Sequence, residues 1–557
     1  MKKQPSTSRP RTTIRTFVSR VNIYQQPEED ILKDRSGLGS TDAMATQVYP
    51  NYPPDLTPEQ EHYLLANLKD WSIAHGLAVR PTTAYVPTKQ DPSVALATTA
   101  PITLYPSLFP RICFEQARSV AKAYNELYSA IASDEEWLKG TVEELLDIDD
   151  FIAELWKVHL DVKKEGYAQP LNLGLFRSDY MVHIDPSDPT SRPTVKQVEF
   201  NTIASSFGGL STQVSALHKH LHSIEAYPDS TSSVIADTAL PDATSVPKLA
   251  HGMAAAHQAY GPSSSGHPTC VIFLVQEPER NVFDQRHVEY ALNKNHGVRT
   301  FRLPFHRVLK DTRVDSERRL LYAPPHKPDK PFEVSLVYFR AGYSPDEYTT
   351  PDHWKGRLQI ERSAAIKCPS VLTQLAGTKK VQQVLATPHS PHLAKFLPDK
   401  DQASEVLKTF APIYPMDKSE AGLEARSFAQ DAEKCKRYVL KPQREGGGNN
   451  IYRSNIPGFL QEIPEEKWPA HILMEMIEPP AQQNVIFRNG EVQSGGVICE
   501  LGVYGACLWE QGDGDGKREV VESSEAGYLL RTKGSGSEEG GVAAGFGSVD
   551  SACLVDV

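Results

Sequence analysis

Helical spacing of apolar residues dominates the first half of the chain. Ordered sequence is predicted to begin near Tyr52, and Thr57-Pro58 has the pattern of a helix start, with apolar residues following from Tyr63 to Trp71. A longer amphipathic helix is predicted from Phe114 to Ile131, where apolar residues recur every three or four positions. The acidic segment Asp134 to Asp150 is then interpreted as a solvated helix face.

From Cys270 onward, short apolar runs indicate buried strands. Cys270 to Val275 is such a run, followed by a helical stretch from Phe283 to Asn293 and further strands at Val298 to Arg302 and Leu336 to Phe339. Strands that alternate with helices predict a βαβ domain with a parallel sheet, here over residues 269–378.

After Gly377 the pattern predicts a mixture of helices and strands. Asn489-Gly490 and Asp515-Gly516 are typical of hairpin turns, so several of these strands are expected to be antiparallel. The fold class predicted is therefore α/β with mixed α+β character. The candidate strands are Arg437 to Leu440, Ile472 to Ile477, Val485 to Arg488, Val497 to Leu501 and Val520 to Glu522.

Composition narrows the function classes. Among 557 residues, 59 Lys and Arg against 70 Asp and Glu give a formal net charge of −11, which argues against nucleic acid as a partner because phosphate backbones are bound by clustered cations. Hydrophobic residues at 39% and charged residues at 23% are typical of globular proteins. No apolar stretch approaches the roughly 20 residues of a membrane span, which excludes an integral membrane protein and leaves no membrane partner.

The first 50 residues differ from the rest. Up to Gln26 they contain six Lys and Arg and no acid, which fits an organelle transit peptide, a solvated disordered tail, or an upstream start with Met44 as the true first residue. Residues 228–247 are rich in Asp, Ser, Thr, Pro and Ala and are interpreted as a surface insertion or linker. Seven scattered cysteines without a CxxC pair indicate free thiols in a reducing compartment.

The segment Tyr438 to Asn450 has the most informative chemistry. A β-rich run ends at Lys441, Pro442 keeps it extended, and three glycines at 446–448 let backbone N–H groups approach an anion closely. Lys441 on a phosphate and Glu445 on Mg²⁺ would suit a nucleotide site, but a flexible turn between strands is an equal alternative. The segment is not a Walker A loop, and Gly261 to His267 lacks the lysine of that motif and is better interpreted as a linker.

Two further segments are weaker candidates. Arg531 to Lys533 precedes the small residues Glu538 to Gly545, which suit either a loop that closes over a ligand or a disordered end. In Val198 to Thr202, strand alternation puts Glu199 and Asn201 on one face about 7 Å apart, as Mg²⁺ oxygen ligands or as a solvent-facing strand side. Gly512 to Gly516 is a hairpin tip rather than a calcium loop, and no HExxH zinc pattern occurs.

In this order, these segments resemble eukaryotic-type glutathione synthetase, a member of the ATP-grasp superfamily. The resemblance spans about Tyr52 to Val549, and the triple-glycine segment with its flanks is its most specific part. The matching stretches are Arg177 to Met181, Gln197 to Leu210, Gln276 to Arg286, Val337 to Tyr343, Leu375 to Lys380, Lys441 to Tyr452, Met474 to Pro479, Leu529 to Lys533 and Gly540 to Gly545.

The resemblance implies an ATP-grasp fold with an inserted parallel-sheet substrate-binding domain and a glycine-rich lid. Residues 51–268 would form the N-terminal part of the catalytic domain, 269–378 the substrate-binding domain, and 379–557 the nucleotide-binding and lid region. The implied activity is ATP-dependent ligation of γ-glutamylcysteine to glycine through an acyl phosphate. A ligase for β-alanine or serine and a non-catalytic ATP-binding homologue are alternatives. A dinucleotide-binding oxidoreductase is disfavoured because GxGxxG does not follow the first strand of the 269–378 region.

The family's site residues transfer position by position. Arg177 and Arg531 would offset charge on the acyl phosphate and the tetrahedral intermediate, and Glu199, Asn201 and Glu445 would bind Mg²⁺. The ATP contacts would be Glu199, Lys379, Lys441, Gly446, Gly447, Gly448, Asn450, Tyr452, Met474, Glu475, Met476, Ile477, Glu500, Lys533 and Glu539. The substrate contacts would be Arg177, Ser206, Glu279, Asn281, Gln285, Arg340, Tyr343, Arg531, Val542 and Ala543.

This chain departs from the family pattern at three positions. Glu539 replaces an Asp before the lid glycines and keeps the charge, Ala341 replaces an Asp after the strand arginine, and Ala204 replaces a Ser. None of them removes a metal ligand or a phosphate-binding lysine, so an active enzyme is expected. The resemblance also implies a homodimer, and cytoplasmic localisation is expected.

Overall fold

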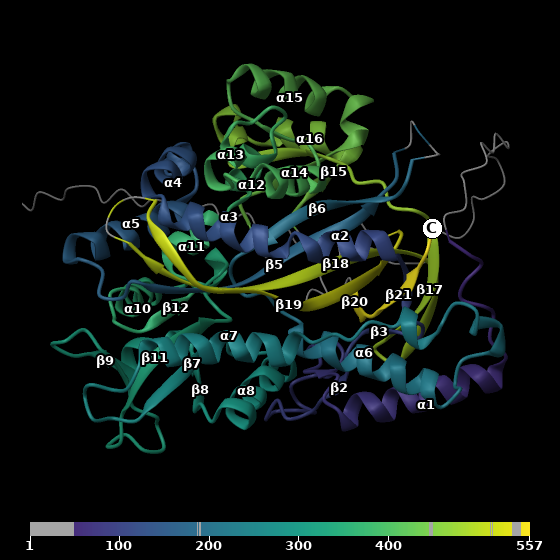
Figure 1. Ribbon diagram of the computed structural model, residues 1–557, viewed down its shortest axis with the longest axis horizontal. Coiled ribbons are helices and arrows are strands. Elements are labelled where there is room, and N and C mark those ends of the chain that lie inside the picture. The colour runs from purple at the N-terminus through teal and green to yellow at the C-terminus, as the bar shows by residue number, and fades with distance from the viewer. Residues whose placement is uncertain are drawn as a thin grey trace, which may run out of the picture. The chain divides into compact units, whose positions relative to one another are not determined.

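A large mixed sheet organises the chain. The computed structural model describes residues 49–557 except 186–187, 189–190, 445–448, 513, 515 and 537–546. Within these residues the sheet runs β17-β3-β20-β19-β18-β5-β12-β11-β10-β9, with β6 beside β5 and with β7 beside both β11 and β8 (Figure 1). Its strands are β3 Ile102–Thr103, β5 Leu171–His183, β6 Thr194–Asn201, β7 Thr269–Val275, β8 Thr300–Pro304, β9 Thr312–Val314, β10 Leu320–Tyr322, β11 Phe332–Phe339, β12 Ile366–Cys368, β17 Gln482–Arg488, β18 Glu491–Gln511, β19 Arg518–Gly534 and β20 Gly547–Asp550.

The region from Thr269 contains the parallel strands that the sequence predicts. β7 pairs in parallel with β8 and β11, and β11 pairs in parallel with β12. The intervening helix α8 covers Val282–His296, a few residues longer at its C-terminal end than its apolar spacing indicates. β12 then pairs in parallel with β5, so this region continues the same sheet that contains the long antiparallel strands.

The C-terminal strands form long hairpins. β17 and β18 are antiparallel and turn at Asn489 and Gly490, whose φ angles of 51° and 86° confirm the predicted hairpin. β18 pairs along its length with β19 and, on its other side, with β5. The antiparallel prediction for this part of the chain is therefore confirmed.

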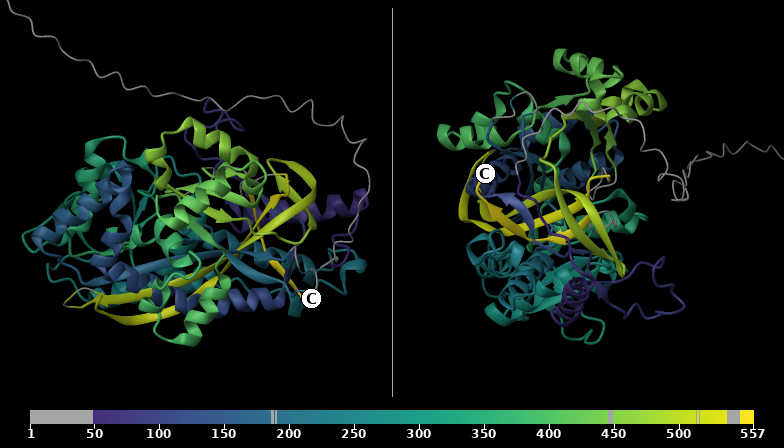
Figure 2. Two further views of the ribbon diagram at one scale, coloured as in Figure 1. Left: turned by 90° about the horizontal axis from the view of Figure 1, so that it is seen from above. Right: turned by 90° about the vertical axis from the view of Figure 1, so that its right-hand side faces the viewer.

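A second, four-stranded sheet of order β13-β16-β14-β15 lies among the helices that follow α12. In Figure 1 helices α12 to α16 lie on one side of the long strands, and α6, α7 and α8 lie on the other; Figure 2 shows the same layers from two further directions. The strands of this sheet are β13 Ile413–Pro415, β14 Tyr438–Pro442, β15 Ile451–Tyr452 and β16 His471–Glu475. The two-stranded sheets pair β1 Ala78–Val79 with β2 Thr98–Thr99, and β4 Ser107–Pro110 with β21 Ala552–Val555.

The N-terminal helices differ from the sequence prediction in two places. The helix expected from Phe114 to Ile131 is interrupted at Val120, where ψ is −3° and α2 gives way to α3. The acidic segment after it is not simply a solvated face, because Asp134 and Asp149 are buried N-caps that accept backbone hydrogen bonds of α4 and α5. At Thr57 the predicted start is confirmed as a full capping box.

The remaining helix bounds are those of the described residues. They are α1 Pro58–Ala74, α2 Arg111–Ser119, α3 Ala121–Ser133, α4 Glu135–Val142, α5 Asp150–Glu165, α6 Gly208–Ser223, α7 Ser245–Tyr260, α9 Val308–Asp311, α10 Pro351–Glu361, α11 Val371–Ala376, α12 Lys379–Ala386, α13 His392–Phe396, α14 Lys400–Thr409, α15 Glu420–Gln430 and α16 Ile456–Glu462.

Apolar residues are buried on both faces of the long strands. One face packs on α2 and α3, and the other packs on α6 and α7. The segment 228–247 is more tightly packed than a linker, since Ile235, Leu240 and Ala243 are buried. All seven cysteines are free, as expected, and all are buried. Among the described residues, no helix has the length and apolar character needed to cross a membrane.

We predict that Asp550, on β20, makes stability depend on pH. Burial raises the pKa of this carboxyl to about 6, even though the hydroxyls of Thr103, Ser107 and Thr532 donate hydrogen bonds to it at 2.6–2.7 Å. The folded chain therefore binds this proton more tightly than the unfolded chain, and this group's contribution falls as pH rises from about 4 to about 6, by about 3 kcal/mol.

Urea unfolding across this range would test the prediction. Relative to the unchanged chain, Asp550→Asn should become more stable as pH rises, because the amide does not ionise. A stability difference that stays constant between the two ends of the range would contradict it.

Candidate active site

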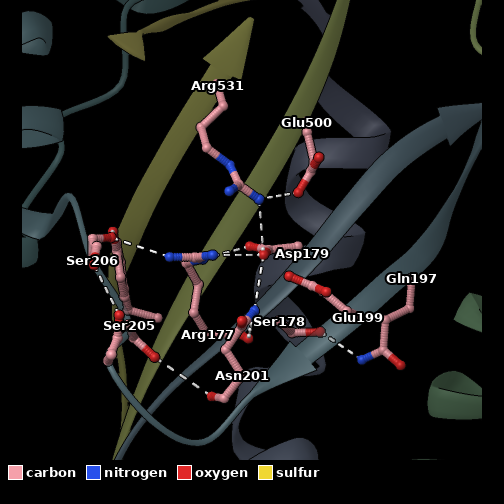
Figure 3. Close-up of polar contacts among 12 residues, drawn as sticks. Arg177, Ser178, Asp179, Gln197, Glu199, Asn201, Ser205, Ser206, Glu500 and Arg531 are labelled. Atoms are coloured by element: carbon pink, nitrogen blue, oxygen red, sulfur yellow. Dashed lines mark hydrogen bonds and ion pairs between the residues drawn. The ribbon is translucent and has the colours of Figure 1, made fainter. Parts of the chain in front are cut away.

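Four neighbouring strands place charged side chains on one face of the large sheet. In the register of β6 and β5, Asn201 lies opposite Arg177 and Glu199 lies opposite Asp179. In the register of β18 and β19, Glu500 lies opposite Arg531. Because side chains two residues apart on a strand share a face, these pairs form one polar surface, drawn in Figure 3.

Ion pairs connect the two predicted catalytic arginines through a buried carboxylate. Asp179 accepts from Arg177 Nε at 2.6 Å and Nη2 at 2.8 Å, and from Arg531 Nη2 at 2.9 Å. Arg531 also pairs with Glu500. Burial lowers the pKa of Arg177, but the Asp179 carboxylate outweighs this and the net shift is upward, so the guanidinium stays charged. For Arg531, burial also lowers the pKa, and Glu500 and Asp179 together raise it above its ordinary value.

Two lysines approach this surface from outside the large sheet. Lys379, the first residue of α12, pairs with Glu199 at 2.9 Å, and Lys441 of β14 donates from Nζ to the Val198 carbonyl oxygen at 2.9 Å. Burial raises the pKa of Glu199, but Lys379 and Lys441 outweigh it and hold the pKa well below its usual range. Glu199 is therefore an anion at neutral pH, and the predicted convergence of Lys441 with the Glu-x-Asn strand is seen in the structure.

A cleft of about 880 Å³ lies over this surface. It also reaches the end of β16, where Met474 and Glu475 are followed by Met476 and Ile477. The sequence-predicted residues that line it are Arg177, Glu199, Asn201, Ser206, Tyr343, Lys441, Asn450, Tyr452, Met474, Glu475, Met476, Ile477, Glu500, Arg531 and Lys533.

Four predicted substrate residues are described but do not line the cleft: Glu279, Asn281, Gln285 and Arg340. Arg340 connects to the cleft through Ser206, and Asn281 connects to Arg340 through Asp284. Arg340 donates from Nη2 to Ser206 Oγ at 2.6 Å. Gln285 donates to Glu279 at 2.6 Å, and the Asn281 backbone N–H donates to the same carboxylate at 2.8 Å. Three buried polar atoms of this group have no hydrogen-bond partner among the described residues: Arg340 Nε, Asn281 Oδ1 and Gln285 Oε1.

Seven predicted residues lie outside the described residues: Glu445, Gly446, Gly447, Gly448, Glu539, Val542 and Ala543. The chain just before the glycines is fixed on both sides. Arg444 pairs with Asp149, the N-cap of α5, and Gln443 accepts from the Lys380 backbone N–H at 3.1 Å.

Sequence reasoning missed two carboxylates that position the site. Asp179 lies within the Arg177 to Met181 motif, and its two-residue offset from Arg177 was the available signal. Asp284 lies within the Gln276 to Arg286 motif; it accepts from the backbone N–H groups of Phe207 at 2.9 Å and Gly209 at 2.7 Å, and it pairs with Arg340 at 3.3 Å. Asp284 thereby joins the start of α6 to Arg340.

The described donor set fits a hard cation such as Mg²⁺. Glu199 contributes an ionised carboxylate and Asn201 an amide oxygen, and Mg²⁺ combines one or two protein oxygens with phosphate oxygens and waters. Within the residues that the structure describes, no cluster of three or more His, Cys, Asp or Glu side chains suits a metal held by protein groups alone.

The chain matches a known protein family over most of its length. The family described as "Eukaryotic glutathione synthase, ATP binding domain" matches residues 58–554. The glutathione synthetase large chain of Schizosaccharomyces pombe is 38% identical over 514 residues, covering 89% of this chain and 98% of that protein. Human glutathione synthetase is 36% identical over 499 residues, covering 88% and 96%. The chloroplastic enzyme of Arabidopsis thaliana is 35% identical over 489 residues, covering 87% and 84%.

Among solved structures, a glutathione synthetase-like effector from Globodera pallida superimposes with a TM-score of 0.67 at 21% identity, covering 90% of this chain and 98% of that one. At this identity the likeness supports the fold. The mixed α/β architecture, with its large mixed sheet and many helices, is of the ATP-grasp type that the sequence predicts.

We predict that Gly209→Ala disturbs the start of α6. A Cβ at this position would lie 2.4 Å from the Asp284 carbonyl oxygen and 2.9 Å from its Cα, which are backbone atoms that cannot rotate away. Overpacking of this kind costs about 1–3 kcal/mol. Thermal unfolding should therefore show a lower midpoint for the variant.

Gly140→Ala is the matched control, since Gly140 lies within α4 and its Cβ would meet nothing within 4 Å. This change should be neutral or stabilising by up to about 1 kcal/mol. Equal effects at the two glycines would contradict the close approach of α6 to Asp284.

Proposed function

The chain belongs to the eukaryotic glutathione synthase family, and we propose that its cleft joins γ-glutamylcysteine to glycine with the energy of ATP. The curated relatives cover most of the chain, and the enzyme class is an ATP-dependent carboxylate–amine ligase. The structural observation that supports the proposal best is the convergence of Arg177, Arg531, Lys379 and Lys441 around Glu199, because this reaction moves a phosphoryl group between anionic partners.

The proposed reaction has two displacements. A carboxylate oxygen of the dipeptide attacks the γ-phosphorus of ATP, the P–O bond to ADP breaks, and an acyl phosphate forms. The glycine amine then attacks the acyl carbon, the tetrahedral intermediate collapses with loss of inorganic phosphate, and the nitrogen releases a proton. Activation is required because a free carboxylate is a poor electrophile.

Arg177 and Arg531 are proposed to offset the charge of the acyl phosphate and of the tetrahedral oxyanion. Arg177 is buried and the Arg531 side chain is only 12% exposed. Both are held by Asp179 and both line the cleft, so their charges are fixed before the reaction begins. Charge that is fixed in a water-poor site stabilises a transition state more effectively than mobile charge does. Lys379 and Lys441 are proposed to meet the transferred phosphoryl group.

The groups beside the cleft match an amino acid head group. We propose that Arg340 and Tyr343 bind the α-carboxylate of the γ-glutamyl group, and that Glu279, Asn281 and Gln285 accept from its ammonium. The buried Asn281 Oδ1 and Gln285 Oε1 are acceptors, and Arg340 Nε is a donor, so a bound zwitterion would satisfy all three.

Adenine is proposed to bind along Met474 to Ile477, with Glu500 and Lys533 nearby on the nucleotide. Mg²⁺ is proposed to bind Glu199 and Asn201 together with Glu445, which lies outside the described residues. When bound, the metal would neutralise charge on the phosphates. The glycines at 446–448 and the lid residues Glu539, Val542 and Ala543 remain proposals for phosphate contact and water exclusion.

The division into regions 51–268, 269–378 and 379–557 is retained as a proposal, as are a homodimer and cytoplasmic localisation. Light scattering and imaging of a tagged full-length chain would test the last two. An assay must identify the acceptor amino acid. A ligase for β-alanine or serine would differ from one for glycine only by small changes in the pocket.

We predict ADP release only when ATP, γ-glutamylcysteine and glycine are all present. Lys441→Met should lower kcat by about 100- to 1000-fold, as when a fixed transition-state charge is removed. A coupled ADP-release assay with a panel of small amino acids measures both. Tight ATP binding with no product from any acceptor would instead support the non-catalytic homologue.

We also predict that Glu199→Gln weakens divalent metal binding. Loss of even an outer-shell partner costs about 10- to 100-fold in metal affinity, so loss of a charged ligand should cost at least this much. Electron paramagnetic resonance of Mn²⁺ in the presence of a non-hydrolysable ATP analogue measures the affinity. Glu478→Gln, which removes a carboxylate from the same cleft, is the control and should leave the affinity unchanged.

A further inference from the structure

Asp179 is buried behind the cleft, where it accepts four hydrogen bonds from three residues that line it. Its exposed fraction is 0%, and its Oδ1 accepts from Arg177 Nε at 2.6 Å. Its Oδ2 accepts three bonds, from Arg177 Nη2 at 2.8 Å, Arg531 Nη2 at 2.9 Å and Asn201 Nδ2 at 2.9 Å. One side chain thus contacts both proposed catalytic arginines and one proposed metal ligand (Figure 3).

The contact with Asn201 determines which end of its amide faces the cleft. The Nδ2 group donates to Asp179 Oδ2 and, at 3.3 Å, to the Arg177 carbonyl oxygen. Both neighbours are acceptors, so the amide nitrogen must face them and the amide oxygen must face the other way. A cation requires that oxygen, since an amide N–H₂ would repel it.

The strand beside Asp179 leaves room for this arrangement. Gly502 of β18 lies opposite Asp179 in the register, and a Cβ there would come within 2.8 Å of both Arg177 Cδ and Asp179 Oδ1. The Arg177–Asp179 pair therefore packs directly on a backbone without a side chain.

We infer that Asp179 is a positioning residue for the ligation reaction. It orients the Asn201 amide so that its oxygen faces the metal, and it fixes the Arg177 and Arg531 guanidinium groups in the cleft. This inference rests on the proposed function. It concerns a residue that touches neither substrate nor metal and acts through the three side chains that do.

Asp179→Asn tests the inference. The new amide has one acceptor oxygen in place of two and carries no charge, so it cannot accept from Arg177 Nε and from the three donors at Oδ2 together. The two arginines then compete with Asn201 for that oxygen, and the Asn201 amide is free to turn. Affinity for Mn²⁺ with a non-hydrolysable ATP analogue should fall by about 10- to 100-fold, the usual effect of losing an outer-shell partner. We expect kcat to fall by about 100-fold, with smaller changes in KM, since one fixed charge contact to each arginine is weakened.

The double variant Asp179→Asn with Asn201→Asp restores an acceptor at 201 for the amide at 179. It should recover at least about 10-fold of the lost Mn²⁺ affinity, within the range expected for outer-shell contacts. Asn201→Asp alone is the reference, because a carboxylate at 201 raises Mn²⁺ affinity by its charge. The inference requires that Asn201→Asp gain less in the unchanged chain, where it would face the Asp179 carboxylate, than in Asp179→Asn. If Asp179→Asn alone does not fold, the double variant decides. A folded double variant that binds Mn²⁺ as the unchanged chain does supports the inference. A double variant that is unfolded, or that is folded but does not bind Mn²⁺, overturns it.

Glu333→Gln is the matched control, because Glu333 is a buried carboxylate of β11 that accepts from Ser263, Ser265 and Tyr260 away from the cleft. It should leave Mn²⁺ affinity unchanged. If Asp179→Asn leaves Mn²⁺ affinity and kcat unchanged, the inference is overturned and the proposed function is not affected. If the unchanged chain does not release ADP with both substrates, the proposed function itself is overturned.

Discussion

The need to compensate buried charge determines the construction of this site. The site contains two buried charged residues, Arg177 and Asp179, and a largely buried one, Arg531. An unpaired charge at such a depth would cost several kcal/mol. The antiparallel register of β6, β5, β18 and β19 meets this requirement, since it brings opposite charges to adjacent positions on one face. Paired charges can then remain ionised without water. Such a site holds its charges in place before a substrate arrives.

The charged residues of the site come from both sheets. The large sheet supplies the arginines and carboxylates, while Lys379 and Lys441, which are proposed to bind phosphate, come from α12 and from β14 of the smaller sheet. Lys441 donates to the Val198 carbonyl oxygen, a main-chain atom of β6. The ammonium position is thus set by the main chain of the same strand that carries Glu199.

The sequence alone predicted the individual elements better than their junctions. The βαβ strands, the Asn489-Gly490 hairpin and the capped helix at Thr57 depend on local patterns, and all are present. The break at Val120 and the buried caps Asp134 and Asp149 depend on tertiary packing, which apolar spacing does not encode. At the site, motif resemblance identified many of the residues that line the cleft. It missed Asp179 and Asp284, which act on other side chains and become evident only from three-dimensional contacts.

The charge balance of the cleft favours a metal-bound nucleotide. Among the described lining residues, the cations Arg177, Lys441, Arg453, Arg531 and Lys533 outnumber the carboxylates Glu199, Glu475, Glu478 and Glu500 by one. A triphosphate carries several negative charges, more than this excess can neutralise, and the chain as a whole is acidic, with a formal net charge of −11. A divalent cation closes much of that gap. Glu199 is paired with Lys379 and kept ionised by Lys379 and Lys441, the two lysines proposed to meet the phosphates. A cation bound at this carboxylate would therefore share its site with the nucleotide, and we expect the two to bind together.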